Sequence, residues 1–203
     1  MNKISEITIL MVLYDETEEI ILKNLEKIKN FKIIIVDNKG DAKLKERITQ
    51  KFKISTYYLS NKNLGFSKGF NKALNFCKTK YAFIKNADCC IDEDNIIKLY
   101  DYIKNNQECG IVSPTSYDEN DNLSYNSGKL PENESSNEIL QVKGDVCVEK
   151  VLGSSMFVKM EDLQKIGMFN ENFFIFFSDF ELCKKIRSLN KHVVHIYNSK
   201  CIY

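Results

Sequence analysis

Residues 83–92 read Phe83-Ile84-Lys85-Asn86-Ala87-Asp88-Cys89-Cys90-Ile91-Asp92 and join an apolar strand pattern to a polar turn. The apolar residues 81–84 predict a short buried strand, and Asn86 and Asp88 follow it at alternate positions. Open α/β sheets bind ligands just beyond the carboxyl ends of their strands, where a carboxylate can hold a divalent cation and the cation a diphosphate. Taken alone, an aspartate after a strand more often closes a turn, so the interpretation depends on the rest of the chain.

Strand and helix patterns alternate through the first 112 residues. Apolar runs predict buried strands at 7–14, 32–36, 54–59, 81–85 and 111–112. Helical patterns fill the intervals, and Asp15 with Glu18 three residues later resembles a capping box that opens the first helix. This alternation predicts an α/β fold with a doubly wound, mostly parallel sheet and helices on both faces.

The alternation stops at residues 115–144, which are polar and rich in turn residues. A loop of this length in a compact domain is usually functional or mobile. Order resumes at 146–158, and a helix at 161–166 is expected to end at Gly167. An aromatic run at 169–177, expected to lie mostly in the core with one ring free to stack on a sugar, leads into a helix to Leu189 and a last strand at 192–197. No linker divides the chain, so residues 1–203 are expected to form one domain.

Composition narrows the class of protein. The 203 residues carry a net charge of +1, which offers no bulk field for nucleic acid. The seven cysteines are odd in number and include no C-x-x-C spacing, which favours a reduced, cytoplasmic protein over a disulfide framework. The sequence shows neither a signal peptide nor an apolar run long enough to cross a membrane.

Three predicted strands end in acidic residues, namely Asp15, Asp37 and Asp88. Their strands should lie side by side, so these groups can line one crevice in which a nucleotide fits. Asp37 could accept the imide N–H of a uracil or thymine ring, because a carboxylate only accepts hydrogen bonds. Taken alone, an aspartate at this position more often forms an ordinary Asx turn before Gly40.

The segment 63–71 suggests contact with phosphate, because Gly65 and Gly69 permit close backbone approach and Lys68 adds a positive charge at a helix N-terminus. A second acidic pair, Asp179 and Glu181, follows five phenylalanines. Burial raises a carboxyl pKa and can make such a group a general base near neutral pH. The alternative is that Asp179 caps the last helix.

Together these segments resemble family-2 glycosyltransferases of the GT-A fold, near the rhamnosyltransferase-like branch. They occur in the family's order and cover nearly the whole chain. The segments that carry the resemblance are 7–15, 34–38, 61–66 with Asn71, 85–88, 153–158, 166–174 and 178–183.

The resemblance implies an inverting transfer of a sugar from a UDP- or dTDP-sugar to a glycan or lipid-linked acceptor in surface polysaccharide biosynthesis. Asp179 would be the catalytic base, and Asp88 would bind Mg²⁺ or Mn²⁺ next to Asn86. Residues 1–114 would bind the nucleotide sugar and 115–203 the acceptor. The residues expected to contact the donor are Tyr14, Asp15, Asp37, Asn38, Gly65, Lys68 and Asn86.

The sequence also departs from the family. Ser178 replaces a usual Glu, Asn190 replaces a usual Gly, and Tyr203 stands where a metal-binding His is common. These differences leave open a shortened, catalytically impaired homologue that binds nucleotide sugars as a partner subunit. A sugar nucleotidyltransferase ranks low, because residues 14–17 lack a glycine-rich phosphate loop. The basic residues at 43–53 are most simply solvated, or else contact an anionic membrane at its inner face.

Overall fold

The computed structural model describes residues 3–124, 127–128 and 143–203. Residues 125–126 and 129–142 of the polar stretch 115–144 therefore lie outside the described residues. Within the described ranges the model contains an eight-stranded sheet in the order β3-β2-β1-β4-β9-β5-β10-β7 and a two-stranded sheet of β6 and β8. The strands are β1 (Ile7–Leu13), β2 (Lys32–Asp37), β3 (Thr56–Leu59), β4 (Tyr81–Asn86), β5 (Cys109–Tyr117), β6 (Ser127–Gly128), β7 (Val146–Val148), β8 (Lys150–Val151), β9 (Ser155–Lys159) and β10 (His192–Ile202).

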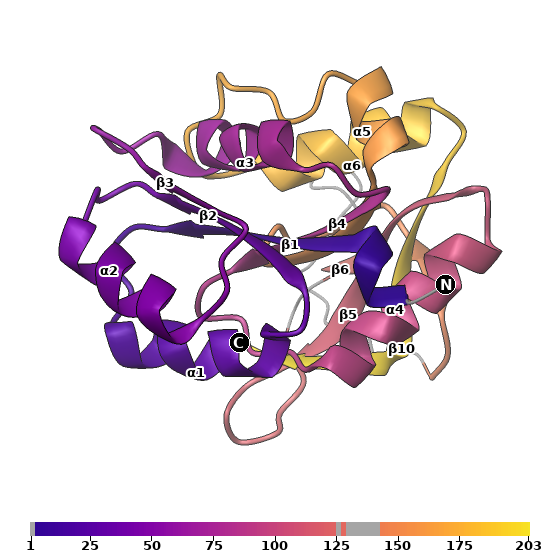
Figure 1. Ribbon diagram of the computed structural model, residues 1–203. Helices are drawn as coiled ribbons and strands as arrows, with labels where there is room; N and C mark the ends of the chain where they lie inside the picture. The colour runs from indigo at the N-terminus through magenta and orange to yellow at the C-terminus, as the bar shows by residue number, and fades with distance from the viewer. Residues whose placement is uncertain (1–2, 125–126, 129–142) are drawn as a thin grey trace.

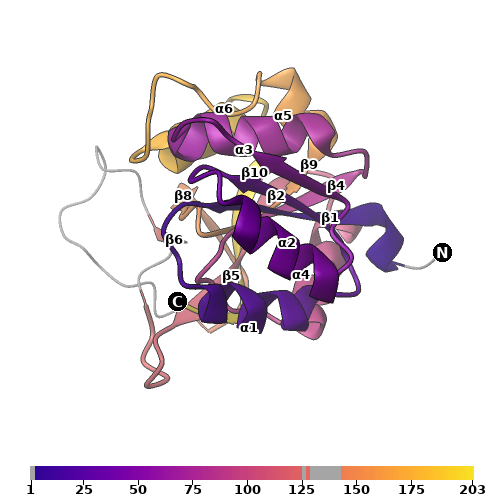
Figure 2. The same cartoon turned by 60° about the vertical axis from the view of Figure 1, so that its left-hand side comes forward.

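Helices cover both faces of the large sheet, which confirms the predicted α/β class (Figure 1). The helices are α1 (Glu18–Ile28), α2 (Ala42–Lys51), α3 (Gly65–Phe76), α4 (Glu93–Asn105), α5 (Met160–Lys165) and α6 (Ser178–Ser188), after a short 3-10 turn at Lys3–Glu6. α1, α2 and α4 pack on one face and α3, α5 and α6 on the other, an arrangement also visible in Figure 2.

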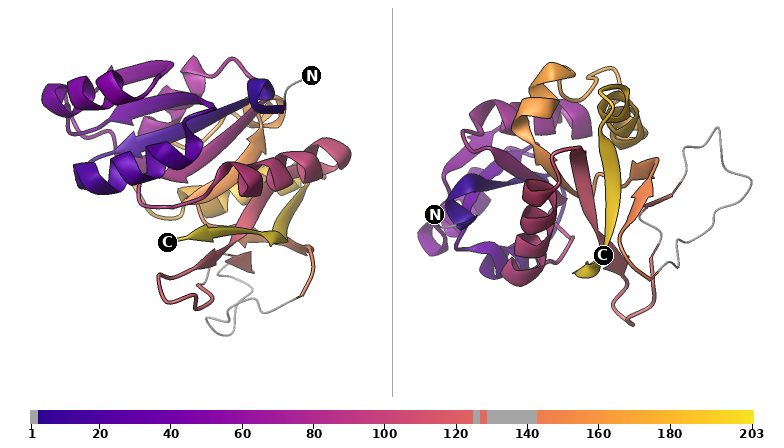
Figure 3. Two further views of the ribbon diagram at one scale, coloured as in Figure 1. Left: turned by 60° about the horizontal axis from the view of Figure 1, so that its bottom comes forward. Right: turned by 90° about the vertical axis from the view of Figure 1, so that its right-hand side faces the viewer.

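The sheet is mostly parallel, as predicted. β1 pairs in parallel with β2 on one side and with β4 on the other, so the strand order reverses at β1. β9 runs antiparallel between β4 and β5, and β10 continues alongside β5 to the end of the chain (Figure 3). The edge formed by the carboxyl ends of β1, β2 and β4 is therefore where an open α/β sheet is expected to bind its ligand.

Several expectations were wrong. Thr17, and not Asp15, caps α1 by accepting from the N–H of Ile20. The strands predicted at 111–112 and 192–197 are longer, because β5 and β10 pair with each other and continue past their apolar cores.

The aromatic run was also misplaced. Phe169 is buried, but Phe174, Phe176 and Phe177 are more than half exposed. This run forms the connection between α5 and α6, and its hydrophobicity does not reflect burial in the core.

Candidate active site

The predicted site residues at three strand ends meet at one edge of the sheet. In the register of the sheet, Leu13 lies opposite Asp37 and Val12 lies opposite Asn86. Tyr14, Asp37 and Asn86 therefore leave the sheet at nearly the same level, on three adjacent strands. This confirms that the three strands lie side by side and places the candidate site at the reversal of strand order.

Asp37 is almost fully buried, with 1% of its surface exposed. Its Oδ1 accepts from the N–H groups of Lys39 at 2.9 Å and Gly40 at 2.8 Å. Its Oδ2 accepts from the N–H of Asp41 at 3.2 Å and the hydroxyl of Tyr57 at 3.1 Å. A carboxylate offers about four acceptor positions, and all are used. The Asx turn before Gly40 is thus present, and contact with a base would require Asp37 to exchange one of these bonds.

A cleft that is open to solvent lies between the ends of β1 and β2 and the starts of α1 and α2. Tyr14 lies at its rim with about half of its surface exposed. Asp15 forms an ion pair with Lys39 at 2.6 Å, and this contact lowers the pKa of the Asp15 carboxyl. The cleft is lined by Leu13, Tyr14, Glu16, Glu18, Ile21, Asp37, Lys39, Asp41, Leu44 and Arg47.

The start of α3 is fixed by contacts within the chain. Asn38 donates from Nδ2 to the carbonyl of Gly65 at 3.1 Å. Gly65 has a φ of +73°, and a Cβ atom there would lie 2.3 Å from the carbonyl oxygen of Phe174. A Cβ on Gly69 would press on Val12 of β1. The space beside both glycines is thus filled by protein, while Lys68 is exposed on the outer side of α3.

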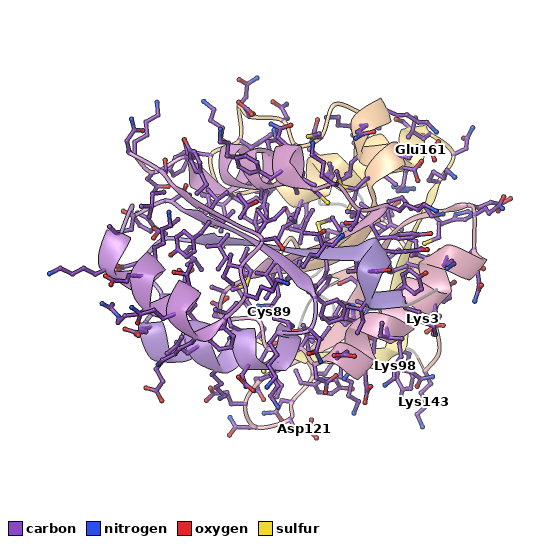
Figure 4. All side chains as sticks on the ribbon, viewed as in Figure 1. Lys3, Cys89, Lys98, Asp121, Lys143 and Glu161 are labelled. Carbon is purple, nitrogen blue, oxygen red and sulfur yellow. The ribbon has the colours of Figure 1, made fainter. Side chains whose placement is uncertain are left out.

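Asn86 and Asp88 occupy the turn after β4. Asn86 donates from Nδ2 to the Tyr203 hydroxyl at 3.2 Å. Tyr203, which directly follows β10, therefore reaches this turn. Burial, with a smaller effect of the nearby Asp88 charge, raises the pKa of the Tyr203 phenol. Asp88 is exposed and has no hydrogen bond or ion pair with any described residue. Cys89, which follows it, points to the α1 side of the sheet (Figure 4).

The donors at this turn fit a hard divalent cation only in part. Within the described ranges no three His, Cys, Asp or Glu side chains come together. The free carboxylate of Asp88 and the amide oxygen of Asn86 are oxygen donors of the kind that Mg²⁺ and Mn²⁺ prefer. Mg²⁺ is commonly held by one or two carboxylates together with substrate phosphates, so this donor set suits a cation that arrives with a diphosphate.

Asp179 lies in the first turn of α6, where Phe177 and not Asp179 is the N-cap residue. Its Oδ2 accepts from the N–H of Gly153 at 2.8 Å. Burial raises the pKa of the Asp179 carboxyl, against the opposing effects of this hydrogen bond and of the Lys150 charge. The direction of this shift matches the expectation, and the alternative, in which Asp179 caps the helix, is wrong.

Gly153 and Ser154 connect the two acidic sites. Ser154 accepts from the N–H of Asn86 at 3.0 Å, and the next residue back, Gly153, donates to Asp179. A Cβ on Gly153 would lie 2.5 Å from the Phe66 ring and 3.3 Å from the Cβ of Asp179. Two consecutive residues before β9 therefore hold the turn after β4 against the start of α6.

The sequence interpretation gave no role to Gly153, Phe66 or Lys150. Lys150 is 3% exposed, and its Nζ lies 4.4 Å from the centre of the Phe180 ring, next to Asp179. A glycine directly before a strand was the signal available for Gly153. Nothing in the local pattern marks a lysine that is distant in sequence as a neighbour of Asp179.

Comparisons with known proteins show which family this chain resembles. Residues 8–177 match the family model "Glycosyl transferase family 2". The chain is 30% identical over 128 residues to the uncharacterized glycosyltransferase MJ1057 of Methanocaldococcus jannaschii, a match covering 58% of this chain and 44% of that protein. It is 24% identical over 193 residues to the rhamnosyltransferase WbbL of Escherichia coli K12, covering 83% of this chain and 72% of WbbL.

Solved structures show the same fold at low identity. All of this chain superposes on 45% of GalNAc-T7, solved with UDP, GalNAc and Mn²⁺, with a TM-score of 0.78 and 12% identity. The mannosyltransferase PcManGT of Pyrobaculum calidifontis, solved with GDP-Man and Mn²⁺, gives 0.71 and 13% identity over 98% of this chain and 56% of its own. The chain thus has the GT-A fold but spans about half of these two structures.

Proposed function

This chain belongs to glycosyl transferase family 2, and from that premise we propose that it is an inverting, metal-dependent glycosyltransferase. Its donor is a UDP- or dTDP-sugar, and its acceptor is a glycan or lipid-linked glycan in surface polysaccharide biosynthesis. The observation that carries the proposal is the pair of backbone contacts through which Gly153 and Ser154 hold Asp179 beside the turn of Asn86 and Asp88. The base that deprotonates the acceptor and the site that holds the diphosphate must be neighbours, because the sugar is transferred from one to the other.

In the proposed reaction, Asp179 takes the proton from an acceptor hydroxyl. The oxygen attacks the anomeric carbon from the face opposite the diphosphate, so the new bond forms with inverted configuration. The bond from that carbon to the diphosphate oxygen breaks, and its electron pair leaves with the nucleoside diphosphate. A bound Mg²⁺ or Mn²⁺ would offset the negative charge on the leaving group, with Asp88 and Asn86 as its protein ligands.

The donor would lie across the carboxyl ends of β1, β2 and β4. Tyr14 lines the cleft, Asp15 forms an ion pair with Lys39, which also lines it, and Asp37 holds the backbone of Lys39. We assign to Lys68, which is exposed on α3, the role of attracting the phosphate charge of the donor. Asn38 and Gly65 hold α3 to the end of β2, so we assign them a positioning role at the donor site.

The first test is a thermal-shift panel of UDP-, dTDP- and GDP-sugars, with and without Mn²⁺, on wild type and Asp88→Ala. We expect one donor class to stabilise the wild type only with metal and to leave Asp88→Ala unshifted. The matching donor then enters a transfer assay with Asp179→Asn as the inactive control. No shift with any donor at any metal concentration would overturn the proposal.

A second candidate function is a nucleotide-sugar-binding partner subunit without turnover. Tyr203 favours it, because its phenol has a raised pKa and stays protonated at neutral pH beside Asn86, which makes it a poor metal ligand. This alternative predicts donor binding that is indifferent to Asp179→Asn and no transfer by the wild type. In the described residues no helix is long and apolar enough to cross a membrane. We propose that the protein works in the cytoplasm, at the inner face of the membrane when its acceptor is lipid-linked.

A further inference from the structure

Four consecutive apolar side chains are exposed in the connection between α5 and α6, and we call residues 174–177 the apolar tip. Phe174 is 57% exposed, Ile175 53%, Phe176 73% and Phe177 57%. Single exposed hydrophobic residues are common on protein surfaces, but a contiguous exposed group marks an interaction site. The tip ends two residues before Asp179, so whatever covers it lies beside the proposed catalytic base.

The apolar tip is held in place by contacts at both of its ends. Phe66 at the start of α3 donates its backbone N–H to the carbonyl of Phe174 at 2.6 Å. Upstream, Asn71 of α3 donates from Nδ2 to the carbonyl of Phe169 at 2.9 Å. Downstream, Phe177 has a φ of 65°, a conformation that bulky side chains rarely adopt, and it leads directly into α6. These contacts fix the backbone of the segment 169–174 against α3.

The surface beside the tip carries positive charge. Residues 61–80, which contain α3, include five lysines and no aspartate or glutamate, whereas the exposed Glu171 precedes the tip by three residues. α3 lies in this stretch, and the connection between α5 and α6 crosses its outer side (Figures 1 and 2). Lys62 and Lys68 are exposed close to the tip, and Lys78 follows at the other end of α3. The acidic Glu161 of α5 lies at the far end of this face (Figure 4).

We propose that the apolar tip and the lysines of α3 dock this protein on a lipid bilayer with anionic headgroups. Aromatic and aliphatic side chains enter the interfacial region of a bilayer, while nearby lysines are attracted to anionic lipid. A sugar-binding site is the weaker explanation, because residues 173–177 are Phe-Phe-Ile-Phe-Phe and have no side chain that can hydrogen-bond a hydroxyl. The proposal rests on the proposed function in one respect, since it selects the lipid-linked acceptor.

The surface formed by the apolar tip and α3 is distinct from the basic segment 43–53, for which the sequence suggested membrane contact. α2 lies on the opposite face of the sheet from α3. Its charges are mixed, because Asp41 caps the helix and Arg47 forms an ion pair with Glu18 at 2.7 Å. It also lacks an apolar group like the tip. The α3 face therefore combines both requirements for binding at a bilayer surface.

The test is flotation of the full chain with phosphatidylcholine vesicles, with and without phosphatidylglycerol. We expect wild type to float with the anionic vesicles, less so with neutral ones, and less at high salt because the charges are screened. The double variant Ile175→Asn/Phe176→Asn should lower the partition coefficient by about tenfold or more, since two apolar side chains no longer enter the lipid. The matched control is Ile20→Asn, an exposed residue of α1 on the other face, which should float like wild type.

Each outcome has a defined meaning. The docking proposal is overturned if wild type does not float with anionic vesicles. It is also overturned if the double variant floats as well as wild type. A double variant that floats normally but loses transfer to a soluble glycan shows that the tip binds the glycan instead. The donor and Mn²⁺ thermal shift is measured in parallel on both proteins. Flotation without any donor shift would contradict the proposed function alone, and a donor shift without flotation would contradict the docking alone.

Discussion

At the scale of single residues, the buried position of Asp179 has different consequences for activity and for stability. Burial raises the pKa of this carboxyl, so the folded protein prefers the protonated form more than the unfolded chain does. Activity requires the ionised form, because a general base must accept a proton. The acid limb of the pH profile should therefore lie above the pKa of an ordinary aspartate, with Lys150→Met moving it higher still.

Ionisation of Asp179 is needed for activity, but it lowers the stability of the folded protein. The contribution of this residue to stability is favourable below the unfolded-state pKa of aspartate and is lost as the pH rises through the raised folded-state pKa. We expect Asp179→Asn to lower kcat by about 10²–10⁴-fold and to unfold at a higher temperature than wild type at neutral pH. Paired thermal melts across the acid range test this, because the difference should shrink as the pH falls. A variant that is less stable than wild type at neutral pH would contradict the assigned environment.

Gly153 lies between Phe66 and Asp179, with no room for a side chain. Gly153→Ala places a methyl group 2.5 Å from the Phe66 ring, so the ring or the backbone N–H that binds Asp179 must move. We expect kcat to fall by about tenfold or more while donor binding stays nearly unchanged, since small displacements of positioned groups are costly. Phe66→Leu removes the ring and should restore part of the activity in the double variant. Equal losses of kcat and donor affinity would instead indicate a general disturbance of the fold.

At the scale of elements, the end of α6 carries a conformation that its sequence does not favour. Asn190 follows the C-cap residue Leu189 and has a φ of 57°. This left-handed position is the one at which glycine is preferred after a helix, because a Cβ atom is unfavourable there. Asn190 is exposed, and no described contact requires its side chain. Asn190→Gly should therefore stabilise the protein by up to about 1 kcal/mol, or roughly 2–4 °C in Tm.

Differential scanning calorimetry of Asn190→Gly measures this gain directly. The matched control is Leu189→Gly, which places glycine at the preceding residue, where φ is −84° and glycine has no advantage. It should not stabilise the protein. A loss of stability in Asn190→Gly would show that the asparagine side chain makes a contact that outweighs the backbone gain.

The elements also show what the sequence could and could not predict. The strands at 7–14, 32–36 and 81–85 were predictable because they are buried on both faces and read as continuous apolar runs. The ends of β5 and β10 could not be predicted, because their pairing depends on contacts between residues about 80 positions apart. The same limit applies to the site. Asp88 and Asp179 stand at recognisable local positions, whereas Gly153 and Lys150 acquire their roles only when β8 and α6 come together.

The exposed phenylalanines were misassigned for a different reason. Hydrophobicity alone predicts burial, but the run at 173–177 has neither the alternation of a strand nor the period of a helix. That absence of period was the available sign that the segment lies in a connection. Only the structure shows that α3 supports its backbone while leaving its rings in solvent.

At the scale of the whole molecule, the two halves predicted for donor and acceptor share one sheet. β9 comes from residues 115–203 but inserts between β4 and β5, pairing Phe83 with Phe157 and Val112 with the same residue. A chain ending at residue 114 would leave β4 and β5 without the strand that joins them. Backbone N–H and C=O groups of both strands would then lack partners, and buried apolar side chains such as Ile84 would be exposed.

We therefore expect residues 1–114 expressed alone to show no cooperative melt and to bind a hydrophobic dye, although all of the residues proposed to contact the donor lie within them. The full chain should unfold in one transition, with the same midpoint by far-UV circular dichroism and tyrosine fluorescence. Calorimetry should give a heat capacity change of roughly 2.4–3.0 kcal/mol/K, the value for 203 residues unfolding together. Donor and Mn²⁺ should move that whole transition, because ligand binding at the ends of β1, β2 and β4 stabilises a sheet to which both halves contribute. A fragment 1–114 that melts cooperatively and responds to donor would show instead that donor binding is independent of β9.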